Sequence, residues 1–399
     1  MSNSSKSHSK MKSILLLPLL LLCIGEAHAQ NTSNQTRHIA VLTPFYLDSA
    51  FDASGQFRFG KTLPSYLNPG METYLGIQLA IDSLQKTGVA INVHIYDTKS
   101  ATQSVENLIR NDSLNQMSFI VGYFNLNESA MIAKFAAARE IPTFNINLPN
   151  DAGINKNEYY SILNPTLNTH CNGLYQFLLK NYNKNPILYF RKKGMMEDKL
   201  QQYFKEAAVR SSSTPLKFRT VMLEDSLSTE QLKLFLDSTK NTVCIIGSLE
   251  STFSLQLCKQ LATLRANYNS TIVGMPTWEQ FDFTKPAYKG AEIIYSTASY
   301  IRPDNKLAQQ ITQQFKEKYF MKTSDLSFRA LEVFLFLTRS SEVQTGKALM
   351  LSLLSNQSSL WGSIDLRPVI QKESGAIEYF ENKKLYYIRK NDGVIKAVY

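Results

Sequence analysis

The fold is decided by the stretch Phe119-Ile-Val-Gly-Tyr-Phe-Asn-Leu-Asn-Glu-Ser-Ala-Met-Ile-Ala-Lys-Phe-Ala-Ala-Ala-Arg-Glu-Ile-Pro-Thr-Phe144. Residues 119–122 form a short apolar run that is typical of a buried strand. Residues 128–140 are rich in alanine and predict a helix, and residues 141–144 predict a second strand. A strand, a helix and a further strand in this order predict two parallel strands with the helix packed across them.

The same alternation extends from this stretch toward both ends of the chain. Before it, the periodicity of apolar residues predicts strands at 38–45 and 90–96 and helices at 69–85 and 104–109. After it, the pattern predicts strands at 186–190, 218–223, 243–247, 271–274 and 292–295 and helices at 197–209, 229–237 and 252–264. We therefore predict an α/β protein with two doubly wound lobes, each a parallel sheet covered by helices on both faces.

The last hundred residues follow a different pattern. Helices are predicted at 306–319 and 327–342, and alternating apolar and polar residues then predict short strands at 377–380, 384–388 and 393–398. Asn391-Asp-Gly393 is a typical hairpin turn between two antiparallel strands. We expect these strands to lie at the edge of a sheet.

Length and charge limit the classes of protein that fit. A chain of 399 residues is too long for one compact core and predicts two domains. Lys and Arg number 43 against 33 Asp and Glu, which gives a formal charge of +10 and raises the question of nucleic-acid binding. The basic residues alternate with Asn, Gln and Glu instead of forming a continuous stripe with aromatic residues, so we expect a solvated surface and no nucleic-acid partner.

The N-terminus has the three parts of a secretory signal peptide. Lys6, Lys10 and Lys12 precede an apolar run at 14–24, and Ala27-His-Ala29 is an A-x-A cleavage site. The run is shorter than the roughly 20 residues that a membrane-spanning helix needs. We predict removal of residues 1–29 and a periplasmic or secreted product. Lipidation at Cys23 is the less favoured alternative, because the preceding Leu22 is not small.

Residues 55–62 match the phosphate-loop pattern G-x-x-x-x-G-K-T. A phosphate loop needs a strand immediately before it and a helix that opens at the lysine. The preceding strand ends near Phe45, and Pro64 and Pro69 interrupt the segment where the helix should be. We interpret residues 48–68 as a long surface loop rather than a nucleotide site.

No pattern of catalytic or metal-binding residues is present. The histidines of the processed chain are isolated in sequence, and neither a nucleophile elbow nor a dinucleotide-binding turn occurs. Cys171, Cys244 and Cys258 remain after processing, and we expect buried free thiols, with a Cys244–Cys258 disulfide as the alternative. We therefore predict a protein that is not an enzyme and has no catalytic residue, metal or cofactor.

Polar and aromatic residues follow the predicted strands, where ligands bind in open α/β sheets. They have few charges and suit hydrogen bonding to a small polar solute, with stacking on an aromatic ring. The candidate ligand-binding residues of the first lobe are Tyr46, Tyr123, Asn125, Asn127, Asn145 and Asn147. Those of the second lobe are Arg191, Ser248, Glu250 and Trp278. Asn and Ser are also ordinary loop formers, which is the alternative interpretation of each.

Several segments together resemble the type I periplasmic solute-binding proteins, which include the leucine/isoleucine/valine-binding proteins and receptor ligand-binding regions. The resemblance spans nearly the whole processed chain. It rests on Ile39-Ala-Val-Leu-Thr-Pro44, Gly76-Ile-Gln-Leu-Ala-Ile-Asp-Ser-Leu84, Ile95-Tyr-Asp97, Ile120-Val-Gly122, residues 136–149, Tyr160-Ser-Ile-Leu-Asn-Pro165 and Gly375-Ala-Ile-Glu-Tyr-Phe380.

This resemblance implies two lobes that close on a ligand by hinge motion and are joined by three crossings of the chain. We place the crossings near Tyr160, Tyr295 and Trp361. The first lobe then comprises 37–160 plus 296–361, and the second 161–295 plus 362–399. The extended loop at 48–68 is atypical of the family.

The resemblance also implies roles for some residues. Where amino-acid binders grip the α-carboxylate with Ser and Thr, this chain has residues 125–127, Asn145 and Asn147, while Glu250 is near the position that holds the amino group. The change from Ser and Thr to Asn leaves an α-amino-acid ligand open.

Two functions compete at this point. The first is a monomeric, non-catalytic solute-binding protein that takes a small polar ligand, such as an amino acid or an amide, and serves the permease of an ABC transporter or a sensor. The second is a ligand-less lobe protein that acts in envelope or peptidoglycan assembly through contacts with envelope proteins.

Overall fold

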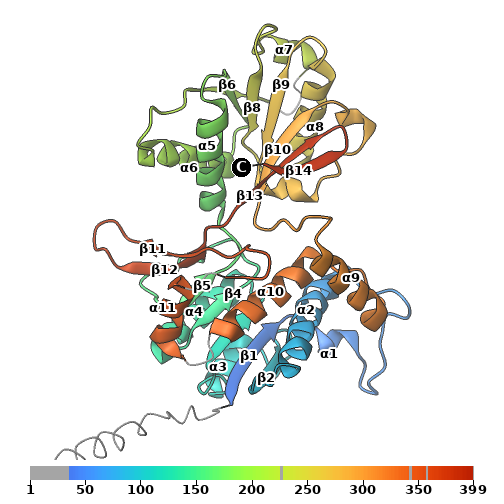
Figure 1. Cartoon of the computed structure of the whole chain (residues 1–399), viewed down its shortest axis with the longest axis vertical. Helices are drawn as coiled ribbons and strands as arrows, with labels where there is room; N and C mark the ends of the chain where they lie inside the picture. Colours follow the sequence, from blue (N-terminus) through green and yellow to red (C-terminus); the bar gives the residue numbers. More distant parts are fainter. Residues whose placement is uncertain (1–35, 225–227, 341–343, 356–357, 399) are drawn as a thin grey trace, which may run out of the picture.

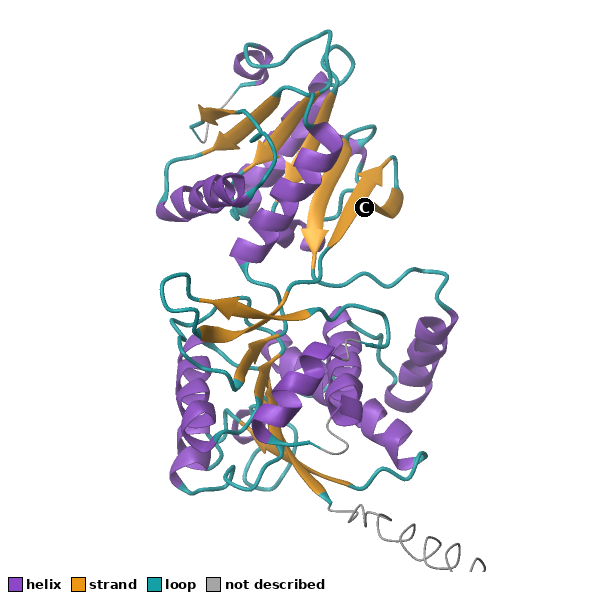
Figure 2. Ribbon diagram, turned by 60° about the vertical axis from the view of Figure 1, so that its left-hand side comes forward, coloured by secondary structure: helices purple, strands orange, loops and turns teal. Residues whose placement is uncertain are grey.

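Two seven-stranded sheets with helices on both faces form two lobes, one above the other along the long axis (Figures 1 and 2). The computed structural model describes residues 36–224, 228–340, 344–355 and 358–398. The predicted signal peptide at 1–29 and the alternative lipidation site Cys23 lie outside these residues. Within the described ranges, no helix is long and apolar enough to cross a membrane.

The first sheet has six neighbouring parallel strands. Its order is β11 (Leu366–Ile370), β12 (Ile377–Asn382), β5 (Tyr160–Ile162), β4 (Thr143–Asn145), β3 (Phe119–Gly122), β1 (Arg37–Thr43) and β2 (Ile91–Asp97). β12 is parallel to β5, and only β11 runs antiparallel to its neighbour. The carboxyl ends of β1, β3 and β4 therefore meet at one edge of the sheet.

The second sheet repeats this plan with a different C-terminal edge. Its order is β14 (Val394–Val398), β13 (Tyr386–Asn391), β10 (Glu292–Thr297), β9 (Ser270–Gly274), β8 (Thr242–Ile246), β6 (Ile187–Arg191) and β7 (Phe218–Met222). β13 and β14 are antiparallel, as their alternating sequence and the turn before Gly393 predicted. The doubly wound fold class predicted from the sequence is confirmed in both sheets.

The helices divide between the lobes. The first lobe carries α1 (Leu47–Ala50), α2 (Asn68–Gln85), α3 (Val105–Arg110), α4 (Leu126–Arg139), α9 (Lys306–Tyr319), α10 (Asp325–Ser340) and α11 (Gly346–Ser355). The second carries α5 (Leu167–Tyr182), α6 (Met195–Arg210), α7 (Thr229–Lys233) and α8 (Ser251–Leu264). Residues 330–338 of α10 are all buried because this helix packs on α2 and contributes to the same apolar core as β1 and β3.

The sequence analysis missed some elements and misplaced others. It did not predict α5, α11 or β11, and it made α7 too long. It assigned the whole of 362–399 to the second lobe, yet β11 and β12 pair within the first sheet, so that part of the assignment is wrong. Alternation of apolar and polar residues indicates that a segment is an edge strand, but it does not indicate which of the two sheets the strand joins.

The chain passes between the sheets three times, and these passages are the crossings used below. The first crossing, 163–166, links β5 to α5; the second, 298–305, links β10 to α9; and the third, 383–385, links β12 to β13. The third crossing therefore lies some twenty residues beyond the predicted position near Trp361.

Two consecutive buried side chains at the end of β12 tie the first crossing to the third. The Glu381 carboxylate, 2% exposed, accepts the Thr166 N–H at 2.8 Å and the Thr169 hydroxyl at 2.6 Å. Lys383 pairs with the same carboxylate. Asn382 donates its amide to the carbonyl oxygens of Leu163 and Ser363. We call Glu381 and Asn382 with these partners the hinge knot.

The surface loop and the cysteines agree with the sequence-based interpretation. Residues 55–62 form turns, and the next long helix, α2, begins only at Asn68, so no helix N-terminus opens at Lys61 to hold a phosphate. Cys171, Cys244 and Cys258 are free and fully buried, which excludes the alternative Cys244–Cys258 disulfide in this structure. Burial raises the pKa of all three thiols.

We predict that Glu381→Ala destabilises the protein by about 2–4 kcal/mol, because it leaves the buried Thr166 N–H and Thr169 hydroxyl without their acceptor. Urea unfolding followed by circular dichroism measures this change. The exposed Glu373→Ala is the matched control and should change stability by less than about 0.5 kcal/mol. Equal effects of the two substitutions would contradict the hinge knot.

Candidate functional site: the cavity between the lobes

A cavity of about 600 Å³ lies between the two lobes beside the crossings. The first lobe contributes residues 148–151 after β4, Arg329 of α10 and Tyr379 of β12. The second contributes the first turn of α5, one side of α6, and Pro276, Thr277, Glu279 and Gln280 after β9. A volume of this size fits a small molecule, and the cavity uses the strand ends where open α/β sheets bind ligands.

Two cationic side chains line this cavity, the exposed Lys199 of α6 and Arg329 of α10. The Arg329 side chain is half-buried and makes no hydrogen bond or ion pair with any residue in the described part of the chain. Burial lowers the pKa of its guanidinium, while the carboxylates of Glu279, Asp325 and Glu332 act in the opposite direction. An arginine has five N–H donors in a planar fork, so an unpaired one in a cavity is suited to a carboxylate.

Two polar groups of the second lobe share the cavity with Arg329. The Thr277 hydroxyl oxygen is buried and has no hydrogen-bond partner among the described residues. Glu279 is exposed, and its Oε2 accepts the Thr297 hydroxyl at 2.6 Å. The cavity thus brings together a cation, an anion and an unsatisfied hydroxyl group.

His170 is buried at the same place and stays neutral. Its Nδ1 lies 2.9 Å from the Ser296 hydroxyl, so it joins α5 to β10. Burial and, secondarily, the charge of Arg329 lower the His170 pKa to about 3. A neutral imidazole leaves Arg329 as the positive charge on this side of the cavity.

The asparagines predicted in the first lobe are occupied by their own backbone. Asn125 caps α4 in a capping box with Glu128, and Asn127 is exposed in the first turn of that helix. Asn145 is buried and accepts the N–H groups of residues 147 and 148. Asn147 bonds both the N–H and the carbonyl of Phe124, at 2.8 and 2.9 Å. These contacts hold the loops after β3 and β4 in shape. They occupy most of the side-chain amide groups that were predicted to bind a ligand.

The two predicted tyrosines lie together at the end of β1 and β3. Burial raises the pKa of the Tyr123 hydroxyl, and the nearby Tyr46 and Glu72 act in the same direction, against a smaller lowering by Asn147. Tyr46 adopts a left-handed conformation with φ of 57°. It is held there by Asp97, whose carboxylate accepts the N–H groups of residues 45, 46 and 47.

The predicted residues of the second lobe also have partners. Arg191 is buried and bonds Asp198 and Gln201 of α6, and Glu250 pairs with Lys192. Ser248 is buried and donates to Glu197 at 2.7 Å. Trp278 is fully buried in the core of the second lobe against Phe281 and Phe283, and its ring is not available for stacking on a ligand.

None of the ten predicted residues lines the cavity in this structure. The segment 276–278 was expected at the cleft, and Pro276 and Thr277 line the cavity while the neighbouring Trp278 points into the core. Sequence reasoning missed Arg329 because it lies inside an apolar helix that the periodicity assigns to the core. An arginine within the otherwise buried face of α10 was the available signal.

Comparisons with known proteins identify the fold of this chain through solved structures. No family model and no curated protein matches the chain. Solved structures do match. A branched-chain amino acid ABC transporter periplasmic ligand-binding protein from Burkholderia xenovorans LB400 is 11% identical with a TM-score of 0.63, covering 91% of this chain and 95% of that one.

Two further structures contain ligands. An ABC transporter substrate-binding protein from Desulfitobacterium hafniense in complex with Leu is 11% identical with a TM-score of 0.57, covering 91% of this chain and 100% of that one. A solute-binding protein of an ABC transporter from R. palustris in complex with benzoate is 13% identical with a TM-score of 0.51, covering 91% and 95%. The chain therefore has the two-lobe fold of the type I periplasmic binding proteins.

We predict that stability falls with acidification because of His170. Since its pKa is about 3 in the folded state and near 6.5 when unfolded, the unfolded chain binds more protons between these values. The free energy of unfolding should therefore decrease from about pH 6.5 down to about pH 3, by about 2 kcal/mol at pH 5. Urea unfolding at pH 7 and pH 5 measures it.

His170→Asn removes this contribution and should lose less stability than the wild type over the same pH interval. An unchanged pH dependence in the variant would contradict the assignment of a buried neutral imidazole.

Proposed function

We propose that this chain is a non-catalytic solute-binding protein that closes its two lobes on a small polar ligand. The observation that carries the proposal is the unpaired Arg329 guanidinium in a cavity walled by both lobes. A half-buried guanidinium that makes no hydrogen bond keeps its N–H donors free, and the carboxylate of a ligand can accept from them. Because the walls belong to different lobes, a ligand that contacts both favours the closed state.

The ligand that fits best carries a carboxylate and a second polar group. Leucine and benzoate, the ligands of two structural neighbours, share a carboxylate. In this chain Arg329 is placed to receive that group, and the Thr277 hydroxyl can add a hydrogen bond. Glu279 can pair with an ammonium or an amide N–H. We therefore propose an amino acid or an amide-like relative, held by Arg329, Thr277 and Glu279 rather than by asparagines.

The site supports binding rather than catalysis. Its histidine is neutral and bonded to Ser296, and no described group of His, Cys, Asp or Glu is arranged to hold a metal ion. The predicted signal peptide supports a location in the periplasm or outside the cell, and we propose that the protein delivers its ligand there as a monomer to a transporter permease or a sensor.

We predict that Arg329→Gln weakens binding of a carboxylate ligand by about 10- to 100-fold, because a charge-assisted hydrogen bond contributes about 1.5–3 kcal/mol. Thermal shift over a library of amino acids, amides and aromatic carboxylates identifies the ligand, which should add about 2.7 kcal/mol of stability at 100 times its dissociation constant. Calorimetry then compares the variant with the wild type.

Arg339→Gln is the matched control: it removes an exposed arginine from the same helix and should leave the affinity unchanged. Failure of every compound in the library to stabilise the protein would favour the ligand-less role in envelope assembly. Capture of a peptidoglycan synthase, in place of a permease, from solubilised envelopes would then support that second role directly.

A further inference from the structure

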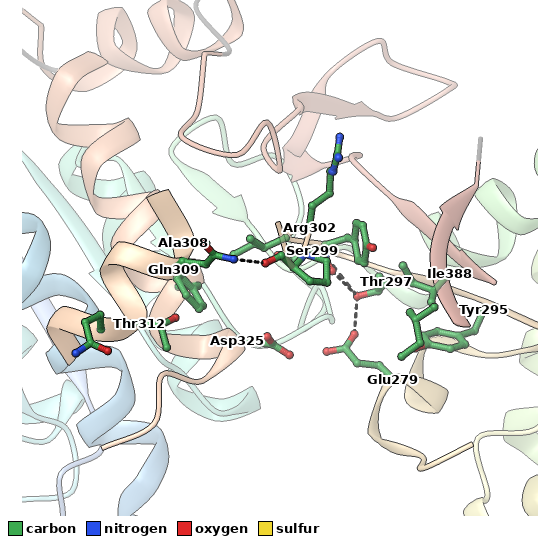
Figure 3. A pocket seen from close by; sticks show the side chains of 16 residues that line it. Glu279, Tyr295, Thr297, Ser299, Arg302, Ala308, Gln309, Thr312, Asp325 and Ile388 are labelled. Carbon is green, nitrogen blue, oxygen red and sulfur yellow. Dashed lines mark hydrogen bonds between the residues drawn. The ribbon is translucent and has the colours of Figure 1, made fainter. Parts of the chain in front are cut away.

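A second cavity, of about 490 Å³, lies beside the second crossing (Figure 3). Residues 299–303 of the crossing form one wall, and the first turns of α9 and α10 form another. Ile388 and Ile395 of the second sheet close it from the other lobe. The two cavities share only Glu279, so most of this lining takes no part in the site described above.

The charge within this cavity is negative. Glu279 and Asp325 both line it, and their carboxylates point toward each other in Figure 3. Arg302 also lines it, but its guanidinium is held by Asp304 in a two-point contact at 3.0 and 2.6 Å. Arg329, which does not line this cavity, lies close enough for the carboxylates of Glu279 and Asp325 to act on its pKa.

Aromatic rings line the same space. Tyr295 is 5% exposed, and its hydroxyl makes no hydrogen bond with any residue that the structure describes. Burial, together with the charges of Glu279 and Asp325, raises the pKa of Tyr295 to about 12. Tyr300 and Phe328 add two half-buried rings. Lys390, whose ammonium lies 5.8 Å from the Tyr295 centroid, lines a different cavity.

We propose that this cavity is a second binding site, and that it takes an organic ammonium compound. Carboxylates of Glu279 and Asp325 supply the ionic partners, and the rings of Tyr300 and Phe328, with that of Tyr295 deeper in the wall, supply an aromatic lining of the kind that attracts such cations. The unbonded Tyr295 hydroxyl and the side-chain oxygens of Thr312 and Gln309 can accept hydrogen bonds from N–H groups. A metal ion is less suited, since most of these groups are rings and amides.

The position gives the site a consequence for hinge motion. Asp325 and Phe328 belong to the first lobe, whereas Tyr295 and Ile388 belong to the second, so a bound cation contacts both. Occupancy would therefore favour one separation of the lobes and change the affinity of the other cavity, an effect that rests on the proposed solute-binding function. Binding of the cation itself does not depend on that function.

Isothermal titration calorimetry of the full chain with choline and with putrescine tests the proposal. We expect at least one of them to bind with a dissociation constant below the millimolar range, and 3,3-dimethylbutan-1-ol, the uncharged analogue of choline, not to bind. Asp325→Asn should weaken the binding by about tenfold and Tyr300→Ala by about threefold, losses consistent with one ion pair and one cation–π contact. Glu106→Gln, an exposed charge on α3 outside both cavities, should have no effect.

Arg329→Gln separates this proposal from the proposed function. It should weaken carboxylate binding in the first cavity but retain or strengthen binding of the ammonium compound, because it removes a neighbouring positive charge. Absence of binding by both probes, equal binding of the uncharged analogue, or insensitivity to Asp325→Asn would overturn the second site. None of those results would affect the assignment of Arg329 as the carboxylate partner.

Discussion

The hinge knot at the end of β12 is the constraint on which the rest of the structure depends. Glu381 holds the N-terminus of α5 through Thr166 and Thr169, and Asn382 holds the carbonyls of Leu163 and Ser363. Two passages of the chain that are separated by more than two hundred residues are thus fixed to one another. Because the first and third crossings are fixed to each other, each lobe can fold around its own sheet while its position relative to the other lobe stays defined.

The cavity between the lobes follows from this arrangement. The second crossing is held by the Thr297 hydroxyl, which bonds Glu279, and by Ser296, which bonds His170. These bonds place the loop after β9 opposite α10, where Arg329 emerges from an otherwise buried helix face. The charged groups of both cavities are therefore consequences of how the crossings are fixed, and Glu279 belongs to both cavities.

Much of the fold could be predicted from the sequence because burial is periodic. The apolar runs at 119–122 and 243–246 are buried on both faces of a parallel sheet, and such strands are distinct from their helices in composition and length. The lobe to which β11 and β12 belong could not be predicted, because pairing with β5 depends on residues more than two hundred positions away. α5 was missed because Asn and Gly interrupt its apolar positions.

The candidate site was harder to predict, since the end of a strand gives a position but not the direction of a side chain. Asn147 is at the predicted edge, yet both ends of its amide bond Phe124. Trp278 follows β9 as expected, but its ring fills the space above Gly274, where any added Cβ would meet it. Arg329 can be recognised as a candidate ligand-binding residue only when the arrangement of the core around it is known.

The central claim, that two lobes close on a ligand at Arg329, is tested most directly by measuring a distance across the cleft. Spin labels can be attached to cysteines introduced at the exposed Asn127 and Met195, one in each lobe, because the three native thiols of the described chain are buried. Double electron–electron resonance then compares the ligand-free protein with the protein saturated by the carboxylate ligand. The account predicts a shift to shorter distances that is absent in Arg329→Gln; an unchanged distribution at saturation would contradict it.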